Sequence, residues 1–306
     1  MKKKMIIASV VLLLAACAFA FRAQLASAFL TARERIFKTG SDSVIVGDDG
    51  FLFFAEEADS YTGVKSITDK EKGAIVQSLA NLSGYANKNG ADFLLIIAPD
   101  KATIYPDKLP DKYTKAETSD LDILYPALES AGIEYIDLRS ALQSKAENEL
   151  IYHRRDTHWN GLGAYYAFCE ICGDLGKPVR DYGERITVND FKGDLDALLY
   201  PGREMYDEDI TFDFSSMFAY TSAYSTPMDM TISTRSDGEG KALIFRDSFA
   251  NALIPYFAST FEEVRFERAN PYKIDTLDTF DAQYVFVVIA ERNIRDLIGA
   301  DSRISN

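Results

Sequence analysis

The apolar positions of the chain alternate between helical spacing and short continuous runs. Ile75, Leu79, Leu82 and Ala86 recur at helical spacing, and the unbroken apolar run 93–98 follows them. A continuous run of this length is typical of a strand that is buried on both faces. Further strands are expected at 133–138, 242–245, 264–266 and 284–290, and helices at 121–128, 162–172, 249–257 and 293–298. Helices that alternate with buried strands predict an α/β fold with a mostly parallel sheet covered on both faces.

Two segments depart from this alternation. Residues 43–54 form two apolar runs around Asp48-Asp49-Gly50, which predicts a hairpin whose turn uses the positive φ of the glycine. Residues 184–240 mix acidic, hydroxyl, tyrosine and methionine side chains without a sustained period. We therefore expect an inserted irregular segment, or cap, of short strands and loops at about 184–240.

The N-terminus is typical of an export signal. Three lysines at 2–4 precede an apolar run at 5–21 that ends at Arg22. We expect a signal or membrane anchor at 1–21, a helical stalk at 22–40 and one domain over 41–306.

The fate of the N-terminal segment has three interpretations. The run 5–21 lies at the short edge of what spans a bilayer, which favours a retained anchor. Cleavage after the small residues around Phe19 would give a secreted protein, and Leu14-Ala15-Ala16-Cys17 looks like a lipobox that would make a lipoprotein. In each case we expect an extracytoplasmic protein, with membrane anchoring or the cell surface as the main expectation.

Composition narrows the class of partner. The 306 residues are 47% apolar, and 33 basic against 47 acidic side chains give a formal charge of -14. We expect no nucleic-acid partner, because such binding relies on clustered lysine and arginine.

The three cysteines of the chain are too few for a disulfide scaffold. Cys169 and Cys172 share the apolar face of one expected helix, where we expect buried thiols.

Polar side chains collect where the expected strands end. They follow residues 98, 152, 245 and 290, and they include both histidines and the single tryptophan of the chain. Ligand-binding loops of open parallel sheets gather at the carboxyl ends of the strands. We therefore expect the chemistry of the protein at this edge.

Ser248, His158 and Asp156 have the side chains of a nucleophile and its activating base. A serine hydroxyl needs an imidazole to take its proton, and the imidazole needs a carboxylate to fix its tautomer. Asp156 and His158 are two residues apart, which in an extended segment places them on one side. Ser248 is expected at a strand-to-helix turn, where helix amides can stabilise an oxyanion. We interpret these residues as a catalytic triad, with a structural remnant as the alternative.

Several short motifs occur in the order of a known family. They are Gly47-Asp48-Asp49-Gly50-Phe51-Leu52-Phe53, Pro99-Asp100-Lys101 with Ile104-Tyr105-Pro106, Asp156-Thr157-His158-Trp159, Asp247-Ser248-Phe249 and Glu291-Arg292. Over about 44–295 the chain resembles the DHHW and alginate O-acetyltransferase-like (AlgX and AlgJ) group of the SGNH hydrolase superfamily. The resemblance implies an SGNH hydrolase-like, flavodoxin-like three-layer fold in a permuted chain order. Thr157 stands at the first histidine of the DHHW name, and Arg246 stands where ordinary GDSL enzymes have glycine.

The resemblance also implies a function. It is that of an extracytoplasmic O-acetyltransferase that modifies a polysaccharide through an acetyl-serine intermediate. Acetyl-CoA is not expected outside the cell, so the implied acetyl source is a membrane-bound acyltransferase partner of the MBOAT type, and no cofactor is expected. An acetyl esterase and a non-catalytic glycan-binding or assembly component remain the alternatives.

Other polar residues of these motifs have competing interpretations. Lys101, Arg292, Trp159 and Arg246 are candidates for contacts to the substrate or the oxyanion. The alternatives are surface or ion-paired roles for Lys101 and Arg292, for instance with Glu291, and packing for Trp159. Asp247 and Asn160 are expected as helix N-caps, and His153 as a packed or surface histidine. We expect no metal, and a site of His153, Asp156 and His158 is the minor alternative.

Overall fold

The computed structural model describes residue 22, residues 40–203 and residues 205–304. The expected signal or anchor at 1–21 and nearly all of the expected stalk at 22–40 lie outside the described residues. No helix within the described ranges has both the length and the apolar character that a bilayer crossing requires.

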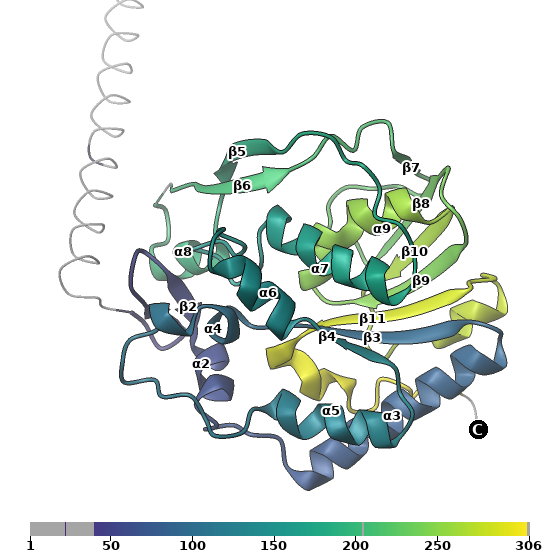
Figure 1. Cartoon of the computed structure of the whole chain (residues 1–306), viewed down its shortest axis with the longest axis horizontal. Coiled ribbons are helices and arrows are strands. Elements are labelled where there is room, and N and C mark those ends of the chain that lie inside the picture. The colour runs from purple at the N-terminus through teal and green to yellow at the C-terminus, as the bar shows by residue number, and fades with distance from the viewer. Residues whose placement is uncertain (1–21, 23–39, 204, 305–306) are drawn as a thin grey trace, which may run out of the picture.

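A mixed sheet forms the centre of the described part of the chain (Figure 1). Its seven strands lie in the order β4-β3-β11-β9-β10-β8-β7. The parallel strands are β3 (Asp92–Ala98), β4 (Tyr135–Asp137), β9 (Lys241–Arg246), β10 (Glu263–Glu267) and β11 (Tyr284–Ala290). β8 (Thr231–Ser236) and β7 (Phe218–Tyr220) continue the sheet as antiparallel strands beyond β10. The apolar runs expected as strands thus form the parallel part of the sheet.

The strand order confirms the expected fold. Counted from β9, the parallel strands β10-β9-β11-β3-β4 lie in the order 2-1-3-4-5, which is the flavodoxin-like order. The chain begins this arrangement at its fourth strand, β3, and reaches its first strand only at β9. This is a permuted form of the fold.

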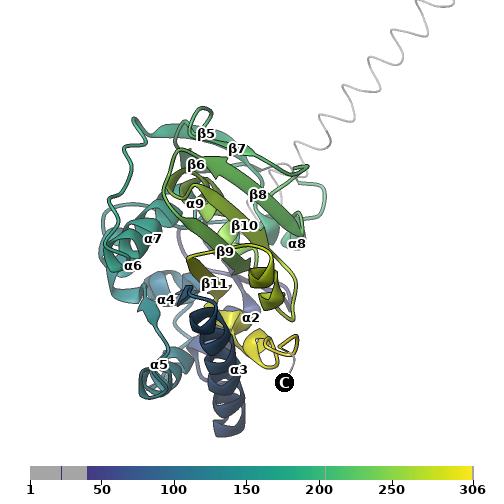
Figure 2. The same ribbon diagram turned by 90° about the vertical axis from the view of Figure 1, so that its right-hand side faces the viewer.

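Helices cover both faces of the sheet (Figures 1 and 2). On one face lie α3 (Asp69–Lys88), α5 (Asp120–Ser130), η3 (Ile274–Asp278) and η4 (Glu291–Leu297). On the other face lie α6 (Arg139–Ala146), α7 (Gly161–Asp174), η2 (Phe249–Leu253) and α9 (Ile254–Thr260). Alternate residues of β3 enter different cores, with Leu95 facing α3 and Ile96 facing the opposite layer. The result is the expected three-layer arrangement.

The expected hairpin is present near the start of the domain. β1 (Val44–Val46) pairs antiparallel with β2 (Leu52–Phe54), and the turn places Asp49 at φ 51° and Gly50 at φ 81°. The apolar pattern does not predict three short helices. α2 (Ala55–Tyr61) follows the hairpin, and α4 (Lys101–Ile104) and η1 (Pro106–Lys108) follow β3.

The irregular segment 184–240 has two structural parts. β5 (Ile186–Phe191) and β6 (Asp207–Thr211) form a separate antiparallel pair, with α8 (Asp194–Leu199) between them. β7 and β8 instead extend the central sheet. The first part matches the expectation of a cap, whereas the second belongs to the main layer.

The central strand β11 should contribute strongly to stability, because it pairs with β3 on one side and β9 on the other. We expect Phe286→Ala to lower the free energy of unfolding by about 3–5 kcal/mol, since this ring is fully buried. Val64→Ala is the control, because Val64 is 73% exposed and should shift stability by less than about 0.5 kcal/mol. Urea unfolding measures both, and equal midpoints for the two variants would contradict the assignment of the core.

Candidate active site

Ser248 lies at the carboxyl end of β9, beside β11. This is the point where the strand order reverses, and ligands of such sheets bind at the crevice there. The preceding Asp247 fixes the turn, because its carboxylate accepts hydrogen bonds from the backbone N–H of Phe249 at 2.8 Å and of Ala290 at 2.8 Å. Asp247 also accepts from the Asn293 amide at 2.9 Å. The N-cap position itself belongs to Ser248, so Asp247 ties η2 to the end of β11 instead of being a simple N-cap.

Ser248, His158 and Asp156 are joined by short hydrogen bonds. The Ser248 Oγ lies 2.8 Å from His158 Nε2, and His158 Nδ1 lies 2.7 Å from Asp156 Oδ1. The second oxygen of Asp156 accepts the backbone N–H of Asp194 at 2.7 Å. Burial opposes ionisation of Asp156, but the hydrogen bond and charge of His158 outweigh it and hold the pKa of this carboxyl well below its usual range. An ionised Asp156 fixes the Nδ1–H tautomer and leaves Nε2 to accept the serine proton.

The segment that carries Asp156 and His158 is a loop and not a strand end. Only an isolated bridge between Tyr152 and Trp159 closes it, so the expectation of a sheet strand at Ile151-Tyr152 is wrong. A loop of this kind has no ladder of backbone partners to hold it. The backbone N–H groups of Leu52 and Asp196 bind the carbonyls of Arg154 and Arg155, and side chains provide the rest of the support.

Lys101 supplies that support from inside the protein. Its side chain is fully buried, and its ammonium donates to the backbone carbonyls of His153 at 3.1 Å, Arg154 at 3.4 Å and Asp156 at 2.5 Å. Burial lowers the pKa of Lys101 to about 8, against the opposing charge of Glu57. The interpretations of Lys101 as a substrate contact or a surface residue are wrong, because every donor direction points to this loop.

Residues near α8 also position the triad, and the sequence pattern did not find them. The carboxylate of Asp194 accepts the backbone N–H of Thr157 at 2.9 Å and its hydroxyl at 2.8 Å. The buried Arg155 binds Asp196 with its Nε at 2.7 Å. Both aspartates lie in the acid-rich segment without a period, so nothing in their spacing distinguishes them from solvated acids.

The substrate candidates Trp159 and Arg246 are also buried. Trp159 is 1% exposed and donates its indole N–H to the carbonyl of Phe249 at 3.0 Å. The packing interpretation of Trp159 is confirmed, and sugar stacking is excluded. Arg246 is 3% exposed and donates to the Asn251 side chain at 2.7 Å and to the carbonyls of Pro227 and Asp229. Arg246 therefore binds the loop before β8, and its interpretation as a substrate contact is wrong.

Arg292 is ion-paired at the same edge of the sheet. Its Nη1 lies 3.1 Å from Asp100 and 3.5 Å from Glu57, and its guanidinium is 5.0 Å from the ring centre of Phe249. The suggested partner Glu291 is not the one that Arg292 binds. Arg292 remains next to the residue that follows Ser248, and its side chain is 9% exposed.

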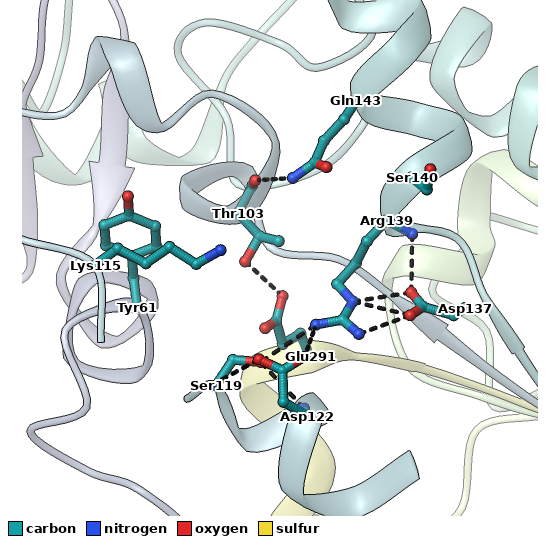
Figure 3. Close-up of a pocket in the computed structure, with 10 residues that line it drawn as sticks. All are labelled: Tyr61, Thr103, Lys115, Ser119, Asp122, Asp137, Arg139, Ser140, Gln143 and Glu291. Carbon is teal, nitrogen blue, oxygen red and sulfur yellow. Dashed lines mark hydrogen bonds and ion pairs between the residues drawn. The ribbon is translucent and has the colours of Figure 1, made fainter. Parts of the chain in front are cut away.

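Glu291 belongs to a different, polar pocket (Figure 3). It accepts the backbone N–H of Asp100 at 2.9 Å and the hydroxyl of Thr103 at 2.8 Å. The pocket has a volume of about 260 Å³, and its Arg139 is neutralised by Asp122 and Asp137. None of the three triad residues lines this pocket, so it is not the space in front of Ser248.

The remaining expectations are largely confirmed. Asn160 is an N-cap that accepts the N–H of Gly163 at 2.9 Å, and His153 is buried and stacked on Phe191 at 3.7 Å. Cys169 and Cys172 are free thiols, of which Cys172 is buried and Cys169 is half-buried.

A metal site of His153 with the triad residues is not assembled. Within the described ranges the side chains that could share an ion are Asp156, His158 and Asp194, without His153. Asp156 and His158 bind each other, and Asp194 binds Thr157. These ligand atoms are therefore already in use.

Known proteins share this fold and part of this sequence. Residues 44–203 match the family described as SGNH hydrolase-like domain, acetyltransferase AlgX. The chain belongs to this family. The matched residues include Asp156 and His158, whereas Ser248 lies beyond them, and the structure joins it to His158.

Individual relatives of this AlgX-type chain are more distant. A probable alginate O-acetylase AlgJ of Pseudomonas syringae is 27% identical over 173 residues, which cover 54% of this chain and 43% of that protein. The chain thus matches less than half the length of this curated relative. A DHHW family protein of Eubacterium siraeum has a TM-score of 0.67 at 19% identity, covering 89% of this chain and 99% of that one. The O-acetyltransferase domain of Pseudomonas putida AlgJ has a TM-score of 0.56 at 20% identity, covering 83% and 92%. These two structures support the fold.

Removal of the buried ammonium should disturb the triad loop. We expect Lys101→Met to lower the free energy of unfolding by about 2–5 kcal/mol, because three carbonyls lose their donor. The exposed Lys70→Met is the matched control, with a change below about 0.5 kcal/mol. Chemical unfolding measures both variants. Equal stability of Lys101→Met and Lys70→Met would contradict the supporting role of Lys101.

Stability should also depend on pH through Glu57. Burial and the nearby Asp100 raise the pKa of Glu57 from 4.5 to about 8. The native state therefore holds a proton that the unfolded chain releases between these values, so the free energy of unfolding should fall as pH rises from about 4.5 to 8. Glu57→Gln stays neutral and should reduce this dependence, while Glu291, whose pKa burial also raises to about 8, retains part of it. Its exposed neighbour gives the control Glu56→Gln, and an unchanged slope in Glu57→Gln would refute the prediction.

Proposed function

We propose that this AlgX-type chain is an extracytoplasmic O-acetyltransferase that acetylates a polysaccharide through an acetyl ester on Ser248. The observation that carries the proposal is the hydrogen-bonded series from Ser248 Oγ through His158 to the ionised Asp156. It lies at the sheet edge where this fold binds ligands. The AlgJ proteins that the chain resembles are named as probable alginate O-acetylases, which supports the same class of reaction.

The geometry supports a two-step transfer. In the first step Ser248 Oγ attacks the acetyl carbonyl of the donor while its proton passes to His158 Nε2, 2.8 Å away. His158 then protonates the leaving oxygen, and the acetyl group remains as an ester of Ser248. In the second step His158 takes the proton of a sugar hydroxyl, the sugar oxygen attacks the ester, and Ser248 regains its proton. Asp156 stabilises the charged imidazole in both steps.

A backbone donor is available for the oxyanion of each step. Ser248 precedes η2, and no hydrogen bond among the described residues uses its backbone N–H. An unengaged N–H of the nucleophile itself is suited to a developing negative charge on the attacked carbonyl oxygen. This donor replaces Arg246, whose guanidinium is engaged elsewhere.

The donor and the location belong to the same proposal. The basic start and apolar run at 5–21 support export and membrane association, and the family resemblance supports an acetyl donor supplied by an MBOAT-type membrane acyltransferase. With water in place of the sugar hydroxyl, the same acetyl-serine would give an acetyl esterase. Orientation of the acceptor decides between the two outcomes.

Loss of the nucleophile is the first test. We expect Ser248→Ala and His158→Ala each to lower turnover of 4-nitrophenyl acetate by at least about a thousandfold, because the two residues act as one unit. Asp156→Asn should also lower turnover, but less severely. Ser216→Ala is the control, since this serine is exposed. Wild-type turnover in Ser248→Ala would refute the serine mechanism and favour a binding protein.

A further inference from the structure

A second cavity adjoins the elements that carry Ser248 and His158, and no triad residue lines it. Its volume is about 350 Å³, which is in the range of small-molecule pockets. Its floor includes Asn251 and Ala252 of η2, three and four residues after Ser248, and Gly161, three residues after His158. The cavity therefore begins within about one helical turn of the serine.

The walls of this cavity come from the segment 184–240 and are rich in aromatic rings. The rings that line it are Phe218 and Tyr220 of β7, Tyr224, and Phe214, which follows β6. Figure 1 shows β6 above α7, and β7 is the edge strand of the central sheet next to β8. Tyr220 is 39% exposed, so its ring is accessible although Tyr224 stacks on it at 3.8 Å. Aromatic faces of this kind pack against the apolar faces of sugar rings.

The charges of the cavity limit which sugars fit. Among the residues that line it the charged one is Asp209, and no lysine or arginine is included. Asp209 Oδ1 accepts the backbone N–H of Gly161 and of Ile210, each at 2.8 Å. Its other oxygen accepts no hydrogen bond within the described part of the chain, which leaves it for a sugar hydroxyl. Arg246 donates to the lining residues Asn251 and Pro227, but it is 3% exposed and does not itself line the cavity. A carboxylated sugar would therefore meet the negative charge of Asp209 with no cation exposed among the lining residues.

We infer that this aromatic cavity is the acceptor subsite and that it takes neutral pyranose residues, not uronates. The inference rests on the proposed function, because it assigns the acceptor of the same serine. It separates this chain from its relatives named as alginate O-acetylases, since alginate is a polyuronate. Ser248 does not line the cavity, so the sugar bound there would hold the glycan while a neighbouring part of the same glycan extends past η2 and presents its hydroxyl to the acetyl-serine.

Binding can be measured without any chemical step. The full chain with Ser248→Ala, in detergent micelles, is titrated by calorimetry with three probes: cellotetraose, fully N-acetylated chitotetraose and tetramannuronate. We expect at least one neutral tetramer to bind about tenfold or more tightly than tetramannuronate. Adding Tyr224→Ala should weaken that binding about tenfold, which is the effect of losing one aromatic contact. The added control Tyr206→Ala removes an exposed tyrosine of the same segment that does not line the cavity, and should leave binding unchanged.

The outcomes separate this inference from the proposed function. Tighter binding of tetramannuronate, no binding of either neutral tetramer, or equal effects of Tyr224→Ala and Tyr206→Ala would overturn the subsite. Those results leave the serine mechanism intact, because it is judged by turnover of 4-nitrophenyl acetate in the wild-type chain and in Ser248→Ala. If the neutral tetramer binds as expected and Ser248→Ala keeps full turnover, the cavity stands as a glycan site and the transferase proposal fails.

Discussion

The position of the triad depends on one buried ammonium group. Asp156 and His158 come from a loop that is not a strand of the sheet. Lys101 donates hydrogen bonds to three backbone carbonyls of that loop from the protein interior. Lys101 itself begins α4, directly after the carboxyl end of β3. The ammonium thus connects the loop to the central sheet that also carries Ser248. A shift of this loop would change the 2.8 Å contact between His158 and Ser248.

The same edge of the sheet concentrates buried charge. Arg292 joins Glu57 and Asp100, while Asp247 joins the turn of Ser248 to the end of β11. Burial and the charge of Asp100 raise the pKa of Glu57 to about 8, so this carboxyl holds a proton where an exposed one would not. Buried ionisable groups of this kind need charged or hydrogen-bonding partners, and here the partners come from several elements. They therefore fix β3, β9 and β11 relative to one another beneath the nucleophile.

Sequence patterns were sufficient for the sheet and for the triad, for different physical reasons. The run at 284–290 is apolar at every position because β11 is buried on both faces, and its predicted bounds are those of the strand. Ser248, His158 and Asp156 were found because few side chain types can activate a serine. The sequence pattern placed β7 and β8 in an insertion instead of in the sheet. β7 has three residues, and Ile232 is the one apolar side chain in β8, so neither gives a clear apolar run.

The roles of the other polar residues could not be predicted, because long-range contacts decide them. The sequence pattern places Lys101, Trp159 and Arg246 at or after expected strand ends, where substrate contacts are common. Each is instead buried against another segment of the chain. Asp194 shows the converse. It has the sequence context of a solvated acid, and its backbone N–H nonetheless binds Asp156.

The central claim is that Ser248 carries the acetyl group between donor and acceptor. The most direct measurement is the intact mass of the full chain after brief incubation with 4-nitrophenyl acetate, followed by peptide mapping of the modified residue. The account predicts one added acetyl group on Ser248, absent in Ser248→Ala and lost on incubation with an acceptor sugar. Turnover of the ester with no acetyl group on Ser248, or with the group on another residue, would contradict it.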